Sequence, residues 1–236
     1  MKKHLDDNML KKIKKTFLFL LVVIVISLVI RIGIGEPCHV PSPSMEPTIM
    51  TGDWLWIDKL SYGGLLPSRW AEIPLVNIFT WIASLREADK KNDWGYHRVP
   101  GIKEIEEGDI VVFKSTENPN ILLVKRLVAI LYAGDTLNIT DFNYDHYRSV
   151  MELEKNRTDV ADDPAFMSDS AFTVVLQNNY YYMLGDNADN SRDSRYFGFV
   201  PEEYIVGKVS LVLFSWDKAL ENRVKFRPKR WFKLIG

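Results

Sequence analysis

One short segment combines a rigid backbone with hydroxyl side chains, a combination that suits nucleophilic chemistry. Residues 40–48 read Val-Pro-Ser-Pro-Ser-Met-Glu-Pro-Thr. Their three prolines fix φ and remove three backbone donors, so neither a helix nor a regular strand ladder can run through the segment. The stiff backbone would hold Ser42 and Ser44 in defined positions shortly after a hydrophobic run that ends near Ile34. Either a hydroxyl reacts here, or the segment is a linker between an anchor and a domain.

A reactive serine needs a base, and one lysine lies in a setting that would make it one. Residues 120–131 are expected to form a long strand, in which Leu123, Lys125 and Leu127 share an apolar face. Desolvation lowers the pKa of a lysine from its usual value of about 10.4, so Lys125 could be neutral and accept a proton from a serine. A lysine that snorkels from an edge strand is the alternative. Arg126 falls on the opposite face, where it can reach solvent or a carboxylate.

Histidine and cysteine offer weaker candidates. His97 and His146 could each serve a serine, but neither has an acidic partner at informative spacing. Cys38 and His39 are adjacent, so in an extended segment they point to opposite faces and cannot easily meet. Cys38 is the only cysteine, which excludes an intrachain disulfide and a cysteine zinc cluster. We expect it to be a small buried apolar residue, and we expect no metal and no cofactor.

A dense polar loop follows at residues 185–195, Gly-Asp-Asn-Ala-Asp-Asn-Ser-Arg-Asp-Ser-Arg. Acidic and amide side chains at this density can hydrogen-bond their own backbone, and the arginines can pair with the carboxylates. Asp186 and Asp189 also suggest a calcium loop. However, Phe197 stands at the twelfth position, where the EF-hand pattern requires glutamate.

The elements that would position these residues are mainly strands. Runs rich in branched and aromatic residues, bounded by turn signals, predict a β-rich core. A further strand, rich in tyrosine, delivers the chain into the polar loop. The other expected strands lie at 54–60, 109–114, 120–131 and 204–214, the last of these being the final strand. The tail from Arg223 to Lys233 is expected to be solvated, with contact to anionic lipid as the alternative.

Two stretches interrupt this pattern as insertions, 62–107 and 136–176. The second is interpreted as a small insertion rather than a second hydrophobic core. In the first, apolar residues between Leu75 and Leu85 recur at helical spacing, with Trp70 nearby. They indicate either an amphipathic helix at a membrane surface or a helix packed on the sheet.

The first 35 residues have the pattern of a membrane anchor. Residues 1–15 carry an excess of lysine and would be cytoplasmic, and residues 16–35 are long and apolar enough to cross a bilayer. Residues 36–236 would then form an extracytoplasmic domain of a single-pass protein. The alternative is a cleaved secretory signal, although Glu36-Pro37 and the glycines before it match the usual cleavage site poorly.

Composition is compatible with a folded domain on such an anchor. The chain has 236 residues, 47% of them hydrophobic and 26% charged, which is typical of folded proteins and leaves room for one sizeable domain. The formal net charge of −1 gives no basic footprint for nucleic acid.

Four of these segments, in the same order along the chain, resemble the bacterial type I signal peptidases, the serine/lysine leader peptidases of family S26. They are the nucleophile segment 40–53, the strand 108–114, the pair Lys125-Arg126, and the polar loop 185–195 with its following Gly-Phe-Val-Pro. The resemblance covers most of 37–217, and the two insertions look like family-variable parts.

The resemblance implies a signal-peptidase-type β-rich catalytic core in which Ser44 is the nucleophile and Lys125 its general base. The hydroxyl of Ser42 and the backbone N–H of Ser44 would form the oxyanion hole. Ser191 would orient the lysine amine, and Asp193 with Arg195 would form a buried supporting ion pair. Asp186 and Asn187 are further supporting positions.

The same resemblance implies an activity and partners. The protein would remove signal peptides from exported preproteins, cleaving after small residues at −1 and −3, in the bacterial cytoplasmic membrane and in contact with the export machinery. A self-cleaving serine/lysine peptidase and a non-catalytic single-pass scaffold are the alternatives.

Two departures from the family pattern are Ala188, where many members have arginine, and Ala133 in a turn. Shallow apolar pockets would be lined by Val40, Pro41, Met45, Ile49, Leu55, Val112 and Val124.

Overall fold

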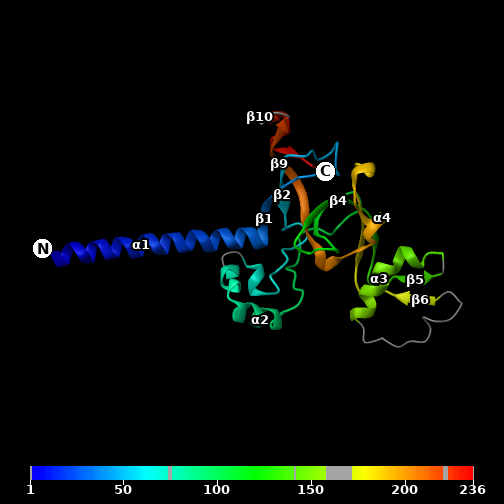
Figure 1. The fold of residues 1–236 in the computed structure, drawn as a ribbon, viewed down its shortest axis with the longest axis horizontal. Coiled ribbons are helices and arrows are strands. Elements are labelled where there is room, and N and C mark those ends of the chain that lie inside the picture. The colour runs from blue at the N-terminus through cyan, green and yellow to red at the C-terminus, as the bar shows by residue number, and fades with distance from the viewer. Residues whose placement is uncertain (1, 74–75, 141, 158–171, 220–222, 236) are drawn as a thin grey trace.

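The computed structural model describes residues 2–73, 76–140, 142–157, 172–219 and 223–235. Its first element is the helix α1, Lys2–Val29, which continues as a π-helical segment over Ile30–Ile34 and projects away from the rest of the chain (Figure 1). Within the described part of the chain, Met9–Ile34 is the one helical stretch long and apolar enough to cross a membrane. The helix begins before residue 16 because the lysine-rich segment consists largely of good helix formers.

An antiparallel curled sheet makes up most of the remaining described chain. The strand order is β1-β2-β9-β3-β4-β7-β8, and β10 and β11 also pair with β9. The mainly β fold predicted from the sequence is therefore confirmed. The strands are β1 (Gly35–His39), β2 (Asp53–Asp58), β3 (Ile110–Lys114), β4 (Leu122–Leu131), β7 (Tyr180–Leu184), β8 (Val200–Pro201), β9 (Ile205–Ala219), β10 (Arg223–Phe226) and β11 (Lys233–Leu234).

Alternation along these strands creates two apolar clusters. Lys125 pairs with Val111 across β3 and β4, and Val111 belongs with Phe113 and Leu127 to one buried cluster. The lysine therefore emerges from a dry part of the sheet. The other cluster holds the nucleophile segment against β2, β3 and β9, and consists of Val40, Met45, Ile49, Leu55, Ile57, Ile110, Val112, Val206, Val209, Val212 and Ile235.

The first insertion leaves the sheet after β2 and returns before β3. Its outgoing and returning arms are joined by backbone hydrogen bonds, including Leu66 N to His97 O (2.9 Å) and Val99 N to Gly64 O (3.0 Å). We call residues 69–93 the tip. It contains the 3₁₀ helices η2 (Trp70–Glu72) and η3 (Val76–Trp81) and the helix α2 (Ala83–Lys91).

The apolar side chains of the tip do not pack on the sheet. Ile78, Phe79 and Trp81 of η3 are exposed, as is Leu85 of α2. The alternative of a helix packed on the sheet is therefore wrong, and Leu75 lies outside the described residues. The predicted helical segment is also divided, because η3 ends at Trp81 and α2 begins two residues later.

The second insertion contains the hairpin of β5 (Thr136–Ile139) and β6 (Phe172–Val175) with the helix α3 (Tyr144–Arg157). Its buried Val150 packs with Tyr180 of β7 and with Phe199. The described part of the insertion thus shares a small apolar cluster with the main sheet.

The C-terminal tail differs in part from the expectation. Most of its described side chains are exposed, as expected, but its backbone is held on the sheet because β10 and β11 pair with β9. For the same reason β9 is not the final strand. Between them the short 3₁₀ helix η7 (Pro228–Arg230) brings Arg230 to the buried carboxylate of Asp53, with N–O distances of 3.0 and 2.5 Å.

Candidate active site

Ser44 lies in the loop that connects β1 to β2. The loop is closed at its base by hydrogen bonds between Val40 N and Asp53 O (2.9 Å) and between Gly52 N and Val40 O (2.9 Å). Met45, directly after the serine, is buried in the apolar cluster. A rigid backbone and a buried anchor thus fix the direction of the Ser44 side chain.

The amine of Lys125 meets this serine from β4. Its Nζ is hydrogen-bonded to Ser44 Oγ at 2.7 Å, across 81 positions of sequence. Only 3% of Lys125 and 8% of Ser44 are exposed to solvent. Loss of water lowers the pKa of Lys125 to about 8; nearby Asp193 and Asp186 oppose this shift and Arg195 adds to it. A substantial fraction of the amine is then neutral in the physiological range.

Ser42 lies next to the nucleophile. Its Oγ is 3.4 Å from Ser44 Oγ, and the residue itself is exposed. A hydroxyl in this position can donate to an oxygen that develops charge beside Ser44. The part of Ser42 in an oxyanion hole stays a prediction.

The polar loop is bonded to Ser44 and to the residue that follows Lys125. Asn187 donates its backbone N–H to Ser44 O and its side-chain amide to Pro43 O, both at 3.1 Å. Asp186 accepts two hydrogen bonds of 2.8 Å from Arg126, which follows Lys125 in β4. Burial alone would raise the pKa of Asp186, but hydrogen bonds from Arg126 and Thr48 outweigh it, so the pKa lies below its usual range. The loop therefore ties β4 to the nucleophile segment.

Asp193 anchors the far side of this loop. Its side chain is fully buried and accepts hydrogen bonds from Gly185 N (3.0 Å) and from Arg195 Nε and Nη2 (2.8 and 2.9 Å). Burial would raise the pKa of Asp193, but these donors hold it far below its usual range. The pair is only half buried, because the side chain of Arg195 is 40% exposed. The expectation of a buried ion pair thus holds for Asp193 but not for Arg195.

Ser191 is buried in the same loop, close to Gly185. A Cβ on Gly185 would lie 2.1 Å from Ser191 Oγ and 2.6 Å from Ser44 O, so only glycine fits. The described residues include no hydrogen bond between Ser191 Oγ and the Lys125 amine. Its role as the group that orients the lysine stays a prediction.

The other expected site residues divide into two groups. His97 and His146 lie away from Ser44: the ring of His97 bonds to Trp94 O, and that of His146 packs among aromatic rings. Cys38 is partly buried against the cluster under the nucleophile loop, where burial raises the pKa of its thiol. Val124, one of the proposed pocket residues, is partly buried against this cluster, whereas Pro41 is exposed and does not belong to it. The other proposed pocket residues are buried members of the cluster: Val40, Met45, Ile49, Leu55 and Val112.

Sequence reasoning missed one support of the nucleophile loop. Arg230 bonds to Asp53 and also donates to Thr48 O at 2.9 Å, which connects the C-terminal end to the loop. Asp53 is the last residue of the nucleophile segment, and a carboxylate at that place was the signal that the sequence offered. Nothing in the sequence indicates its partner 177 residues away.

A serine whose hydroxyl meets a buried, partly neutral lysine on a β-rich scaffold is the arrangement of a serine hydrolase with an amine base. Comparison with known proteins makes the class specific. The chain belongs to the family of the signal peptidases, peptidase S26, whose profile matches residues 13–216. It is therefore a peptidase, and its family supports an activity in removing signal peptides.

Individual relatives agree with this assignment. A signal peptidase I of Rickettsia typhi is 30% identical over 243 residues, covering 88% of this chain and 84% of the relative. A signal peptidase I of Pseudomonas aeruginosa is 28% identical over 240 residues, covering 86% and 74% respectively. A crystal structure of a signal peptidase I from Enterococcus faecalis aligns with 47% of this chain at 26% identity and a TM-score of 0.27.

Proposed function

We propose that the protein is a membrane-anchored serine endopeptidase that removes signal peptides from exported preproteins with a Ser44/Lys125 dyad. The observation that carries the proposal is the 2.7 Å hydrogen bond between two buried groups, Lys125 Nζ and Ser44 Oγ. A buried amine that forms no ion pair among the described residues and whose pKa is lowered to about 8 is a suitable base for an alcohol.

The mechanism is acyl transfer in two steps. Neutral Lys125 takes the proton of Ser44 as the serine oxygen attacks the scissile carbonyl, and the oxyanion accepts hydrogen bonds from the Ser42 hydroxyl and the Ser44 N–H. The protonated lysine then gives its proton to the leaving amine, which leaves an acyl-enzyme. A water molecule, deprotonated by the same lysine, hydrolyses this ester and restores the serine.

The polar loop supports the base in this scheme. Asp193 and Asp186 raise the pKa of Lys125 while burial and Arg195 lower it, so the balance keeps the amine neither permanently charged nor too weak a base. Ser191, buried beside Asp193, would orient the amine toward Ser44.

The substrate would bind as an extended peptide with small residues at −1 and −3. Val124 and Cys38 are partly exposed at the edge of the apolar cluster that holds the nucleophile loop, so small side chains could rest there while larger ones would meet closed packing. Within the described chain, β1 pairs with β2 along one edge, and the start of β4 pairs with β3 along one edge. Their other edges offer backbone groups for an added strand.

The anchor places this reaction at the surface of a membrane. α1 would span the bacterial cytoplasmic membrane with residues 1–15 inside and the catalytic domain outside, near the export machinery that delivers preproteins. The chemistry requires no cofactor and involves no nucleic acid.

Two alanine substitutions test the dyad. Ser44→Ala and Lys125→Ala should each abolish cleavage of a foreign preprotein, while Lys103→Ala, at an exposed lysine, should retain it. An acylating serine-peptidase inhibitor should label the wild-type chain at Ser44. Cleavage retained by Lys125→Ala contradicts the dyad. Failure of the wild type both to cleave in trans and to react with the inhibitor would favour a non-catalytic scaffold.

A further inference from the structure

The tip of the first insertion exposes several of the largest apolar side chains in the domain. Trp81 is 84% exposed, Phe79 61% and Ile82 55%, and these three are nearly consecutive. Scattered exposed apolar residues are normal in soluble proteins, but a contiguous group of this size indicates a binding surface. Trp70, Ile78, Leu85 and Trp94 are also exposed in or beside the tip.

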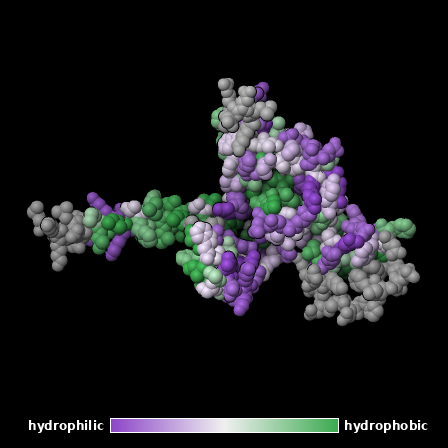
Figure 2. All heavy atoms as spheres, in the orientation of Figure 1, coloured by the Kyte–Doolittle hydropathy of each residue, from purple (hydrophilic) through white to green (hydrophobic). Residues whose placement is uncertain are grey.

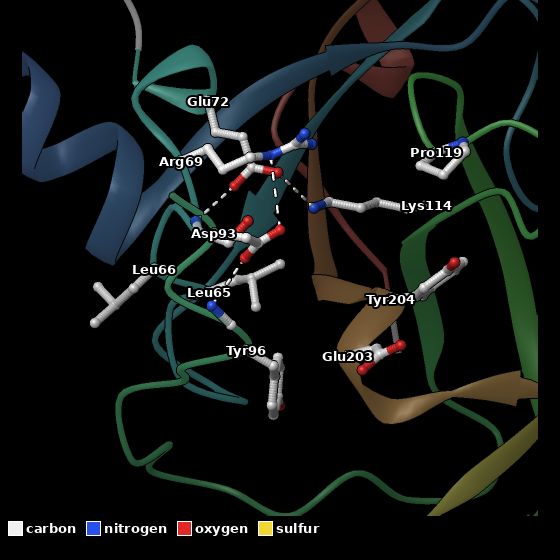
Figure 3. Close-up of a pocket in the computed structure, with 12 residues that line it drawn as sticks. Leu65, Leu66, Arg69, Glu72, Asp93, Tyr96, Lys114, Pro119, Glu203 and Tyr204 are labelled. Carbon is white, nitrogen blue, oxygen red and sulfur yellow. Dashed lines mark hydrogen bonds and ion pairs between the residues drawn. The ribbon is translucent and has the colours of Figure 1, made fainter. Parts of the chain in front are cut away.

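Charged residues of the tip face the sheet, whereas its exposed apolar residues do not. A cleft of about 450 Å³ separates the insertion from β3 and from the turn just before β9, and its lining includes Arg69, Glu72 and Lys114 (Figure 3). Glu72 pairs with Lys114 of β3 across the cleft at 3.6 Å. Phe79, Trp81 and Ile82 do not belong to the lining, so their apolar surface is directed elsewhere.

The insertion is fastened to the end of α1. Lys59, where the insertion begins, donates its backbone N–H to Ile34 O at 2.9 Å and its amine to Arg31 O at 2.8 Å. Gly64 passes so close to Gly33 that a Cβ there would lie 3.1 Å from the Gly33 Cα. The tip accordingly lies beside the C-terminal end of α1, and apolar atoms gather on both (Figures 1 and 2).

The end of α1 is also where a membrane surface would be. The 26 residues of Met9–Ile34 correspond to roughly 39 Å of helix, longer than a hydrocarbon core of about 30 Å. Its uncharged part ends at Arg31, a residue that suits the headgroup level. A segment fastened to residues 31–34 is therefore held at interfacial depth.

We infer that η3 and the start of α2, residues 76–85, form a second membrane contact that rests in the outer interface beside α1. The inference depends on α1 spanning the membrane, as the proposed function requires. Lipid is the occupant that fits, because tryptophan and phenylalanine favour the interface and the surface continues the exposed apolar surface of α1. The tip carries four basic and four acidic residues, so the contact is apolar and independent of lipid charge.

The inference can be tested on the full-length chain in phosphatidylcholine vesicles. In a Cys38→Ala background, single cysteines are introduced as Phe79→Cys and Trp81→Cys and labelled with an environment-sensitive fluorophore. Lipids carrying a quencher near the headgroup should quench both labels, at low and high salt alike. Phe142→Cys is the matched negative control, because Phe142 is an equally apolar residue that is 102% exposed on the other insertion. Val25→Cys, within α1, is the positive control, measured with the quencher placed along the acyl chain because this residue would lie in the bilayer interior.

Each outcome is decisive. Quenching at 79 and 81, comparable to that at 25 and absent at 142, supports the contact. Quenching at 25 but not at 79 and 81 overturns the inference and leaves the anchor intact. No quenching at 25 removes the anchor and the inference together, whereas cleavage of a soluble peptide by the same samples still reports on the dyad. Labels at 79 and 81 that are shielded from water but unquenched by lipid would indicate a protein partner and overturn the inference.

Discussion

At the scale of single residues, the ability of Lys125 to act as a base depends on how little water reaches its amine. Lys125 is hydrogen-bonded to a neutral hydroxyl, and the nearest carboxylates, Asp186 and Asp193, are each neutralised by an arginine. Burial therefore dominates its titration, and the lowered pKa follows. The two ion pairs thus have a second effect besides fixing the loop, because they limit how strongly the carboxylates can hold the lysine in its charged form.

The pH dependence of cleavage follows from this titration. Only neutral Lys125 can act as the base, so kcat/KM for a soluble peptide should rise with pH, with a midpoint near the Lys125 pKa of about 8. Arg195→Gln would remove a positive charge that lowers this pKa, so we expect its midpoint to move to higher pH. The measurement is a pH–rate profile for each chain. A flat wild-type profile across the range, or a fall where a rise is expected, contradicts the assignment of the base.

The same lowered pKa predicts a cost in stability. The shift from 10.5 to about 8 corresponds to roughly 3 kcal/mol near neutral pH, where the folded protein must hold a charge that the unfolded chain solvates better. Lys125→Met removes that cost but loses a hydrogen bond to Ser44 worth about 1 kcal/mol. We expect the inactive variant to unfold with a free energy about 2 kcal/mol higher than the wild type near neutral pH.

The sign of the pH effect provides the control. Between pH 8 and 10.5 the unfolded chain binds more protons at this lysine than the folded one, so wild-type stability rises with pH and the advantage of Lys125→Met shrinks. Unfolding in detergent micelles at both ends of this range measures the difference. Lys103→Met, at an exposed lysine, should show no such trend. A Met variant less stable at every pH would show that the amine is not destabilising.

At the scale of elements, the C-terminal segment holds the nucleophile loop. Removing Arg230 with Arg230→Met would leave the fully buried carboxylate of Asp53 without its ion-pair partner, which typically costs about 3–5 kcal/mol. We expect a large drop in melting temperature together with a loss of cleavage, since Arg230 also bonds to Thr48 O in the loop. The exposed neighbour Lys229→Met should be neutral. Adding Asp53→Asn to Arg230→Met should recover part of the stability; no recovery would show that the buried charge is not the cause.

This element also shows where sequence reasoning ends. Alternation placed Lys125 in an apolar row, and the prolines indicated a stiff loop, because both are local patterns. Two contacts depend on the order of the strands in the sheet: that between Ser44 and Lys125, and that between Asp53 and Arg230. The two-residue alternation of side chains along a single strand cannot reveal this order. The pairing of the tail with β9 is local, but the basic and mixed composition of the tail does not indicate it. The helical spacing around residues 76–85 indicated an amphipathic segment correctly, but not that η3 and α2 would divide it.

At the scale of the whole molecule, the anchor and the catalytic sheet are joined without a linker. The helical part ends at Ile34 and β1 begins at Gly35. A Cβ on Gly35 would lie 2.3 Å from Ile57 O, so the helix end is held tightly against β2. Lys59 adds a hydrogen bond to Arg31 O and an ion pair with Glu36 at 2.9 Å. Under the proposed function, the orientation of α1 in the membrane would therefore set the orientation of the Ser44–Lys125 site.

This rigid joint predicts a difference between two kinds of substrate. Inserting a short Gly-Ser segment between Ile34 and Gly35 should leave the dyad intact, because Ser44 and Lys125 are held by the sheet and the polar loop. Cleavage of a short soluble peptide should be unchanged. In contrast, kcat/KM for a membrane-inserted preprotein in vesicles should fall by roughly tenfold or more, because the dyad is no longer held at a fixed position relative to the scissile bond. In detergent micelles no planar surface orients the substrate, so the inserted variant and the wild type should cleave the preprotein equally. Equal cleavage of the preprotein in vesicles by the inserted variant and the wild type would mean that the joint does not position the site. The substrate would then reach the dyad by diffusion.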